Sequence, residues 1–217
     1  MLTIHTADLL VTGDPRRSPV PGGAILVSGR EIASAGPYEE LAAAYPSARV
    51  RRWPGLIGPG LLNAYGPELL ERAYHPDPRE AGELGGEPIT GEAALASLGM
   101  TDTRWGASAR RGVQRMLAHG TVAVAGDLWR AAVVDAVRRA GLSMEERFAE
   151  PSGPPDLDPL AGCSSLAEAI LMPLVPHEGT AATFAVFDVP DEAALLARGG
   201  GTCVATVVDG RLVHRRR

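Results

Sequence analysis

The sequence predicts a mixed α/β fold in which both ends of the chain build one small β-sandwich around a different middle. Short β-prone runs bounded by Gly and Pro fill residues 1–59 and return in 180–217, which is typical of strands and hairpins. Residues 60–179 instead place apolar side chains at helical spacing around a buried strand. We therefore expect a composite β-sandwich domain, 1–59 together with 180–217, and an α/β insertion, 60–179.

Strands dominate the first part of the chain. Apolar runs between turn residues predict strands over 7–13, 22–30 and 31–36. A proline at its start and another at its end favour a short helix over 37–46. One more strand is expected over 49–53.

The last part of the chain returns to the same pattern. A strand is expected over 183–188 and a short acidic helix over 191–197. Residues 202–214 contain the pair Asp209-Gly210 between two β-branched runs, which predicts a tight hairpin.

The middle of the chain predicts one α-β-α unit. Helices are expected over 108–119 and 131–140, each followed by glycine, with a buried strand over 121–127 between them. Two segments, 75–88 and 150–159, are rich in Pro, Gly and acidic residues and lack apolar periodicity, so we expect mobile loops there.

Composition limits the classes of function open to this chain. Hydrophobic residues make up 45% of it, enough for an ordinary core. The formal net charge is −5, whereas nucleic-acid-binding domains usually carry a basic face, so we expect no nucleic-acid partner. The sequence contains no lysine, which excludes a lysine Schiff base and a carbamylated-lysine metal bridge.

We expect a cytoplasmic protein that does not enter a membrane. The first residues lack the basic start and apolar stretch of a secretory signal, and no apolar run approaches the roughly 18 residues of a membrane span. Cys163 and Cys203 lie far apart without CxxC spacing, so we expect two reduced thiols that fill apolar space.

Four stretches, taken in order, resemble the amidohydrolase superfamily of the imidazolonepropionase, cytosine-deaminase and aminofutalosine-deaminase kind. Residues 7–36 are similar to the family's strands before the barrel, and 53–64 to the segment that enters barrel strand one. Residues 119–127 resemble the strand after the first barrel helix, and 181–213 the strands that close the sandwich. The resemblance implies that 60–179 is a shortened, incomplete β/α-barrel remnant.

The same resemblance implies that the family's zinc or iron site is not retained. In active members the entry segment ends in Asn-Ala-His-x-His, whose imidazoles hold a metal that activates water. Here Asn63-Ala64 is followed by Tyr65, Gly66 and Pro67, and the later ligands have no counterpart. We therefore expect no metal ligands and no cofactor.

The length of the middle segment also predicts an incomplete barrel. A closed eightfold barrel takes about 250 residues, whereas only about 120 lie between the two sandwich halves. Two or three β/α units fit into that length. A partial parallel sheet leaves an open edge and an uncovered face, so we expect a homo-oligomer or a partner protein to cover it.

Asp127 is the most notable carboxylate because it ends the buried strand, where the sites of barrel proteins gather. The alternative is that Asp127 caps the helix that begins near Trp129. Trp129 and Arg130 are candidates for binding an anionic or aromatic ligand.

Further candidates follow the altered motif. Tyr65, Glu68 and Glu71 stand at helix-like spacing where the resemblance places the mouth of the former active site. His75 lies in loop 75–88 near two carboxylates, and we expect it to be solvated.

Two functions of different class follow. The first is a degenerate, non-catalytic relative that binds a small molecule or a partner protein. The alternative is a hydrolase or deaminase acting on non-peptide C–N bonds through a reorganised site around Tyr65, Glu68, His75 and Asp127.

Overall fold

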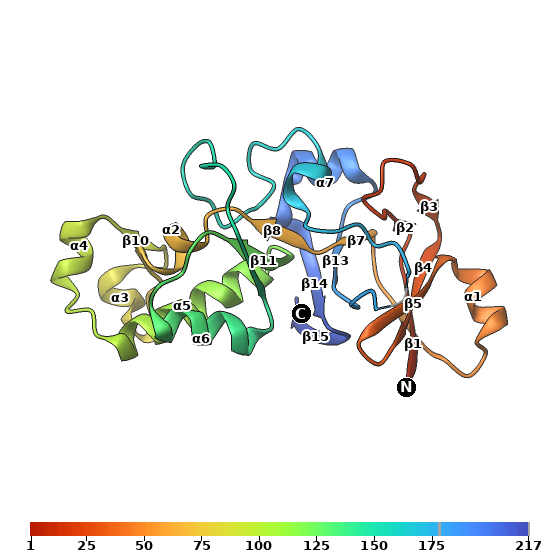
Figure 1. The fold of residues 1–217 in the computed structure, drawn as a ribbon, viewed down its shortest axis with the longest axis horizontal. Helices are drawn as coiled ribbons and strands as arrows, with labels where there is room; N and C mark the ends of the chain where they lie inside the picture. Colours follow the sequence, from red (N-terminus) through yellow and green to blue (C-terminus); the bar gives the residue numbers. More distant parts are fainter. Residues whose placement is uncertain (178, 217) are drawn as a thin grey trace.

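The computed structural model describes residues 1–177 and 179–216 and has the predicted mixed α/β class (Figure 1). These described residues form four sheets, and none of the four closes into a barrel. In Figure 1 the β-rich part lies on the right and the helical part on the left.

Both ends of the chain contribute to a six-stranded sheet with the order β15-β14-β13-β7-β2-β3. In its centre β7 from the first part pairs antiparallel with β13 from the last, with Phe184 opposite Pro59. A second sheet has the order β5-β4-β1-β6. The strands are β1 (Leu2–Thr6), β2 (Leu9–Leu10), β3 (Val20–Pro21), β4 (Gly23–Ser28), β5 (Glu31–Pro37), β6 (Arg49–Arg52), β7 (Leu56–Pro59), β13 (Phe184–Phe187), β14 (Cys203–Val208) and β15 (Arg211–Arg215).

Side chains that alternate along these strands form apolar layers on both faces of each sheet. Ile25 and Val27 of β4 pack with Phe184 and Val186 of β13 in the core between the sheets. The opposite face of the four-stranded sheet packs on Leu41 of helix α1 (Tyr38–Ala44), and that of the six-stranded sheet on helix α7 (Glu192–Arg198). The period of two explains how both faces of each sheet are covered.

The middle of the chain forms a parallel sheet with the order β12-β11-β8. Its strands are β8 (Leu61–Asn63), β11 (Thr121–Ala125) and β12 (Ser143–Glu145). Helices α5 (Asp102–Leu117) and α6 (Ala131–Ala140) make the crossovers and pack together with Val124 in one cluster. The insertion thus contains two consecutive β/α units.

Small elements lie between β8 and α5, at the left of Figure 1. They are α2 (Gly66–Leu70), β9 (Ala73–Tyr74), the 3-10 turn Pro78–Glu80, α3 (Ala81–Leu84), β10 (Ile89–Thr90) and α4 (Glu92–Ser97). Two further 3-10 turns, Leu166–Ala169 and Gly200–Thr202, lie later in the chain.

A long segment without regular strands follows β12 and covers part of the short parallel sheet. Leu160 and Leu166 of this segment are buried in the same cluster as Leu61 of β8 and Phe187 of β13. Ile170 forms an isolated bridge with Leu61. The chain's own loop therefore shields apolar surface that an incomplete barrel would otherwise leave open.

Three expectations about the elements need correction. The first strand is β1, which lies before the predicted run 7–13, and that run contains only the two residues of β2. Helix α5 begins at Asp102, because the Thr101 side chain caps it by accepting the Arg104 N–H. Segment 75–88 contains α3 and a capped 3-10 turn, so it is not one irregular loop.

The expected hairpin turn near the end of the chain is confirmed. Asp209 and Gly210 both have positive φ, 49° and 72°, which is the turn that the hairpin pattern predicts. Cys163 and Cys203 are free thiols, and Cys203 is buried. No helix in the described part of the chain is long and apolar enough to cross a membrane.

Candidate functional site

An ion pair lies at the carboxyl end of the parallel sheet, where barrel sites form. Arg147, which follows β12, makes two contacts with Glu68 of α2: Nη1 lies 3.0 Å from Oε2, and Nη2 lies 3.3 Å from Oε1. Nη1 also donates to the Ala64 carbonyl at 3.2 Å. The two side chains are only 15% and 16% exposed. The hydrogen bond to Glu68 raises the pKa of Arg147, so the guanidinium stays charged.

The altered motif fastens the loop that covers this edge. Asn63 is fully buried and donates from Nδ2 to the Asp156 carbonyl at 2.9 Å, while its Oδ1 accepts the Tyr65 N–H at 2.9 Å. The Tyr65 hydroxyl donates to the Ser152 carbonyl at 2.6 Å. Asp158 accepts the N–H of Gly200 at 2.9 Å, which ties the loop to the strands from the end of the chain.

Asp127 does not cap helix α6, contrary to one expectation. Helix α6 has no side-chain cap at its N-cap residue, Arg130. Glu71 instead holds the turn before the helix, because its Oε1 accepts the N–H groups of Trp129 at 3.0 Å and Arg130 at 2.7 Å. Asp127 is exposed and lines a cavity beside Arg147. Glu71 is 2% exposed, and burial raises its pKa. Local sequence could not indicate this contact, because Glu71 lies far from α6 in the chain.

His75 is buried, which corrects the expectation of a solvated side chain. Its Nε2 lies 2.8 Å from the Leu69 carbonyl, and its backbone N–H donates to the Ser108 hydroxyl at 2.9 Å. Gly112 of α5 leaves room for the ring, because a Cβ there would lie 2.6 Å from Nε2. Burial lowers the pKa of His75. The ring packs between α2 and α5, away from the ion pair of Glu68.

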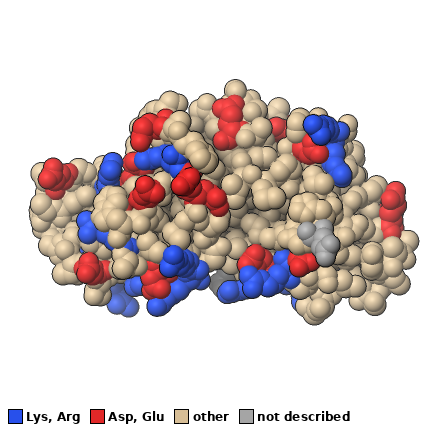
Figure 2. Space-filling model, in the orientation of Figure 1, with Lys and Arg blue, Asp and Glu red and all other residues tan. Residues whose placement is uncertain are grey.

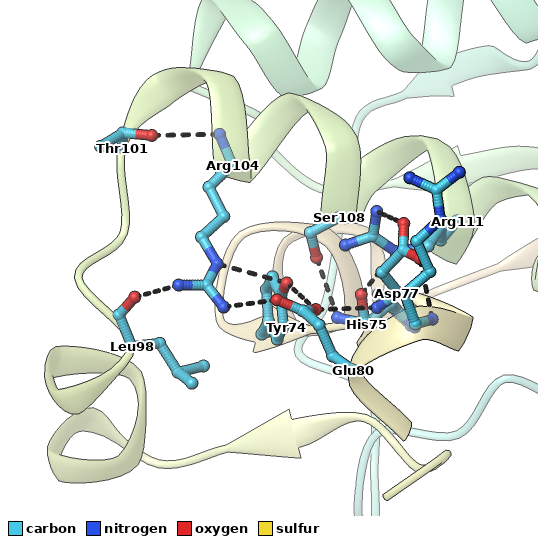
Figure 3. A network of polar contacts seen from close by, with 10 residues as sticks. Tyr74, His75, Asp77, Glu80, Leu98, Thr101, Arg104, Ser108 and Arg111 are labelled. Carbon is cyan, nitrogen blue, oxygen red and sulfur yellow. Dashed lines mark hydrogen bonds and ion pairs between the residues drawn. The ribbon is translucent and has the colours of Figure 1, made fainter. Parts of the chain in front are cut away.

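The carboxylates near His75 belong to a structural network (Figure 3). Arg104 donates from Nη2 to Glu80 at 2.8 Å and from Nε to the Tyr74 hydroxyl at 3.2 Å. Arg111 donates to the His75 carbonyl at 2.7 Å and lies 3.5 Å from Asp77. The hydrogen bond from Tyr74 is the main cause of a lowered pKa of Glu80. These contacts fasten segment 74–80 to α5.

Three open cavities share Arg72 as a common wall. The first, about 640 Å³, lies between α2 and loop 150–159; the second, about 600 Å³, lies beside Asp127, Arg147 and Phe148. The third, about 730 Å³, contains both residues expected to bind a ligand, Trp129 and Arg130. Figure 2 shows acidic and basic side chains mixed over this helical part of the face.

The residues at the strand ends do not fit the metal that the resemblance implies. Tyr65 and Pro67 stand where imidazoles would be needed, and the charged guanidinium of Arg147 opposes a divalent cation there. Within residues 1–177 and 179–216, no group of three or more His, Cys, Asp or Glu side chains could hold a metal ion.

The chain forms a β-sandwich to which both of its ends contribute, with an α/β insertion of two β/α units. An ion pair between Glu68 and Arg147 lies at the carboxyl ends of the strands of this insertion. Residues 23–48 match the model of the bacterial imidazolonepropionase-like composite domain. That match confirms the predicted resemblance for this part of the chain. A comparison with curated proteins gave no match.

Several solved structures are similar over part of their length. Ochratoxinase of A. niger is 21% identical with a TM-score of 0.46, and 67% of this chain covers 31% of that one. Aminofutalosine deaminase of Helicobacter pylori is 14% identical with a TM-score of 0.44, at 67% and 33% coverage. Guanine deaminase of E. coli is 17% identical with a TM-score of 0.46, at 67% and 36%. The aligned part of this chain spans about a third of each structure.

Proposed function

We propose that this chain is a non-catalytic binding protein built on an imidazolonepropionase-like composite domain. The observation that carries the proposal is the ion pair between Glu68 and Arg147 at the carboxyl end of the parallel sheet. It occupies the place where the resemblance implies an activated water and its metal.

The groups at this edge are already engaged with one another. A general base must come within hydrogen-bond reach of the proton that it removes. Both oxygens of Glu68 instead contact Arg147, and the Tyr65 hydroxyl donates to the covering loop. Asp127 is exposed, and His75 is buried between helices. These different environments of the four residues of the alternative hydrolase site support the non-catalytic proposal.

Binding is supported by the cavities around Arg72. Their volumes of about 600 to 730 Å³ lie within the range of small-molecule sites. The proposal also includes a partner protein or a second copy along β12, because β12 is an edge strand of the parallel sheet.

The test combines metal analysis, turnover and thermal shift on the purified chain. We expect no stoichiometric zinc or iron, no turnover of cyclic amides or aminopurines, and a rise in melting temperature with a ligand that binds the folded state. Stoichiometric metal that a chelator removes together with a hydrolytic activity would overturn the proposal.

A matched pair of variants separates the alternative enzyme from a contaminant. If turnover is seen, Glu68→Gln and Asp127→Asn should abolish it when the alternative site is real. Asp135→Asn serves as control, because this exposed carboxylate on α6 pairs only with Arg139 among the described contacts.

A further inference from the structure

The third cavity, about 730 Å³, lies where α2, α4 and the start of α6 meet. Its lining combines four charged side chains, Glu71, Arg72, Glu92 and Arg130, with apolar surface from Leu95, Trp105 and Trp129. Trp129 is 57% exposed, which is unusual for so large an apolar side chain. Few polar groups in a largely apolar cavity are the usual pattern of a small-molecule site.

Glu71 and Arg130 each carry a buried polar atom without a hydrogen-bond partner. Oε1 of Glu71 accepts two N–H groups from the start of α6, whereas Oε2 is buried and accepts no hydrogen bond in the described structure. Nε of Arg130 is likewise buried and donates to nothing. Leaving such groups unsatisfied is costly, and native structures contain few of them.

The unsatisfied atoms have opposite requirements. Glu71 needs a donor, and its carboxylate is held in place by the backbone of α6. Arg130 needs an acceptor; its guanidinium lies 4.5 Å from the ring centre of Trp105, and no ion pair involves it among the described residues. Arg72 on the same wall adds a second positive charge.

We propose that this cavity binds a free α-amino acid with an aromatic side chain. The ammonium group donates to Glu71, the carboxylate accepts from Arg130, and the ring packs against Trp129 and Leu95. Both polar atoms are shielded in the described structure, so the Glu71 carboxylate and the Arg130 side chain both turn toward the ligand on binding.

The two unsatisfied atoms exclude simpler ligands. An organic cation would satisfy Glu71 but would leave Nε of Arg130 without an acceptor. An organic anion would satisfy Arg130 but would leave the Glu71 oxygen without a donor. A zwitterion meets both needs, and the apolar wall selects an aromatic side chain. The inference deepens the proposed binding function by naming the ligand class.

Calorimetric titration of the intact chain tests the proposal with four probes. L-Phenylalanine should bind saturably, and 3-phenylpropionate, 2-phenylethylamine and L-alanine should each bind at least about tenfold more weakly, because each lacks one of the three recognised groups. Absence of saturable phenylalanine binding, or equal binding of 3-phenylpropionate, would overturn it.

Variants locate the site. Glu71→Gln and Arg130→Gln should each weaken phenylalanine binding about tenfold to a hundredfold. Trp129→Ala, at an exposed position that is not needed for the core, should weaken it as well and decides the result if the buried variants do not fold. Arg139→Gln, at an exposed position of α6, should leave binding unchanged. Unchanged binding in Trp129→Ala and Arg130→Gln would contradict the site.

The two proposals fail in different ways. Metal-dependent turnover would overturn the non-catalytic function without affecting a measured phenylalanine affinity. Loss of phenylalanine binding would overturn this site while leaving the absence of turnover intact.

Discussion

His5 lies in β1 with its ring buried between Trp53 and Phe184. Its Nδ1 accepts a hydrogen bond from Trp53 Nε1 at 3.1 Å. Burial, aided by the nearby positive charge of Arg51, lowers the pKa of His5 from 6.5 to about 4. The folded state therefore holds this imidazole neutral at pH values where the unfolded chain would protonate it.

The first prediction is acid sensitivity that depends on His5. Because the folded pKa lies below the unfolded one, the stabilisation is complete above pH 6.5 and is lost as the pH falls toward about 4. The total loss is on the order of 3 kcal/mol. Urea unfolding of the wild type and His5→Gln at pH 7 and pH 4 should show a smaller decline in the variant. An identical decline in the unfolding free energy of both proteins would contradict the lowered pKa of His5, because the other histidines contribute equally to both.

The second prediction concerns Glu71, whose pKa burial raises. For a carboxyl group with a raised folded pKa, stability is higher when it is protonated and falls as the pH rises from its ordinary value of 4.5 through the folded value. Glu71→Gln should remove this fall, while its amide oxygen can still accept the N–H groups of Trp129 and Arg130. The difference in unfolding free energy between variant and wild type, followed from pH 4 to pH 7, checks it. A constant difference would contradict the raised pKa.

At this scale the sequence indicated some residues and missed others. Tyr65 and Glu68 were expected near the strand ends because they follow the altered motif, and the structure places them there. Arg147 and Glu71 were not recognised as partners, because each acts on residues far away in the chain. Such pairings depend on the tertiary fold and leave no periodic signal.

Loop 150–159 lies against the carboxyl end of β8, and Asn63 holds it by donating to the carbonyls of Asp156 and Leu157. The third prediction is that Asn63→Asp, which keeps the acceptor for Tyr65 but removes the donor, costs at least about 1–3 kcal/mol. It should also increase proteolytic cleavage in the loop, as seen by mass spectrometry.

Ser97→Ala is a suitable control for this loop. The Ser97 hydroxyl donates to the exposed end of α4, so its loss should change stability by no more than about 0.5 kcal/mol. If Asn63→Asp behaved like that control, the loop would not depend on Asn63.

Elements with strong local signals were predicted well. Helix α6 has the predicted bounds, because Gly141 ends it in the left-handed conformation at φ 86°. The strand β1 and the first turns of α5 were missed. β1 is placed by pairing with β4 and β6 rather than by bounding turn residues, and the start of α5 is polar and exposed.

At the scale of the whole molecule, the ion pair joins the segments that follow the two edge strands of the parallel sheet, β8 and β12. Glu68 follows β8, the first parallel strand, and Arg147 follows β12, the last. The fourth prediction is that Glu68→Gln or Arg147→Met alone costs about 1–3 kcal/mol, because each leaves a mostly buried charge with only its longer contact, Arg147 with Glu150 or Glu68 with Arg72. The double variant should lose less than the sum of the two.

Urea unfolding of all four chains gives the interaction energy directly. The accessible surface exposed on unfolding should stay the same, so the denaturant slope should not change. If the losses in unfolding free energy of the two single variants were additive, Glu68 and Arg147 would have no interaction energy, which would contradict the prediction.

Metal content after expression with added zinc and iron tests the central claim most directly. Because Glu68 and Arg147 pair with each other at the strand ends, the wild type should purify with far less than one metal ion per chain. Arg147→Met should not raise that ratio, because the imidazoles that would bind the metal are still missing. One zinc or iron per chain, removed by a chelator with loss of a hydrolytic activity, would contradict the account.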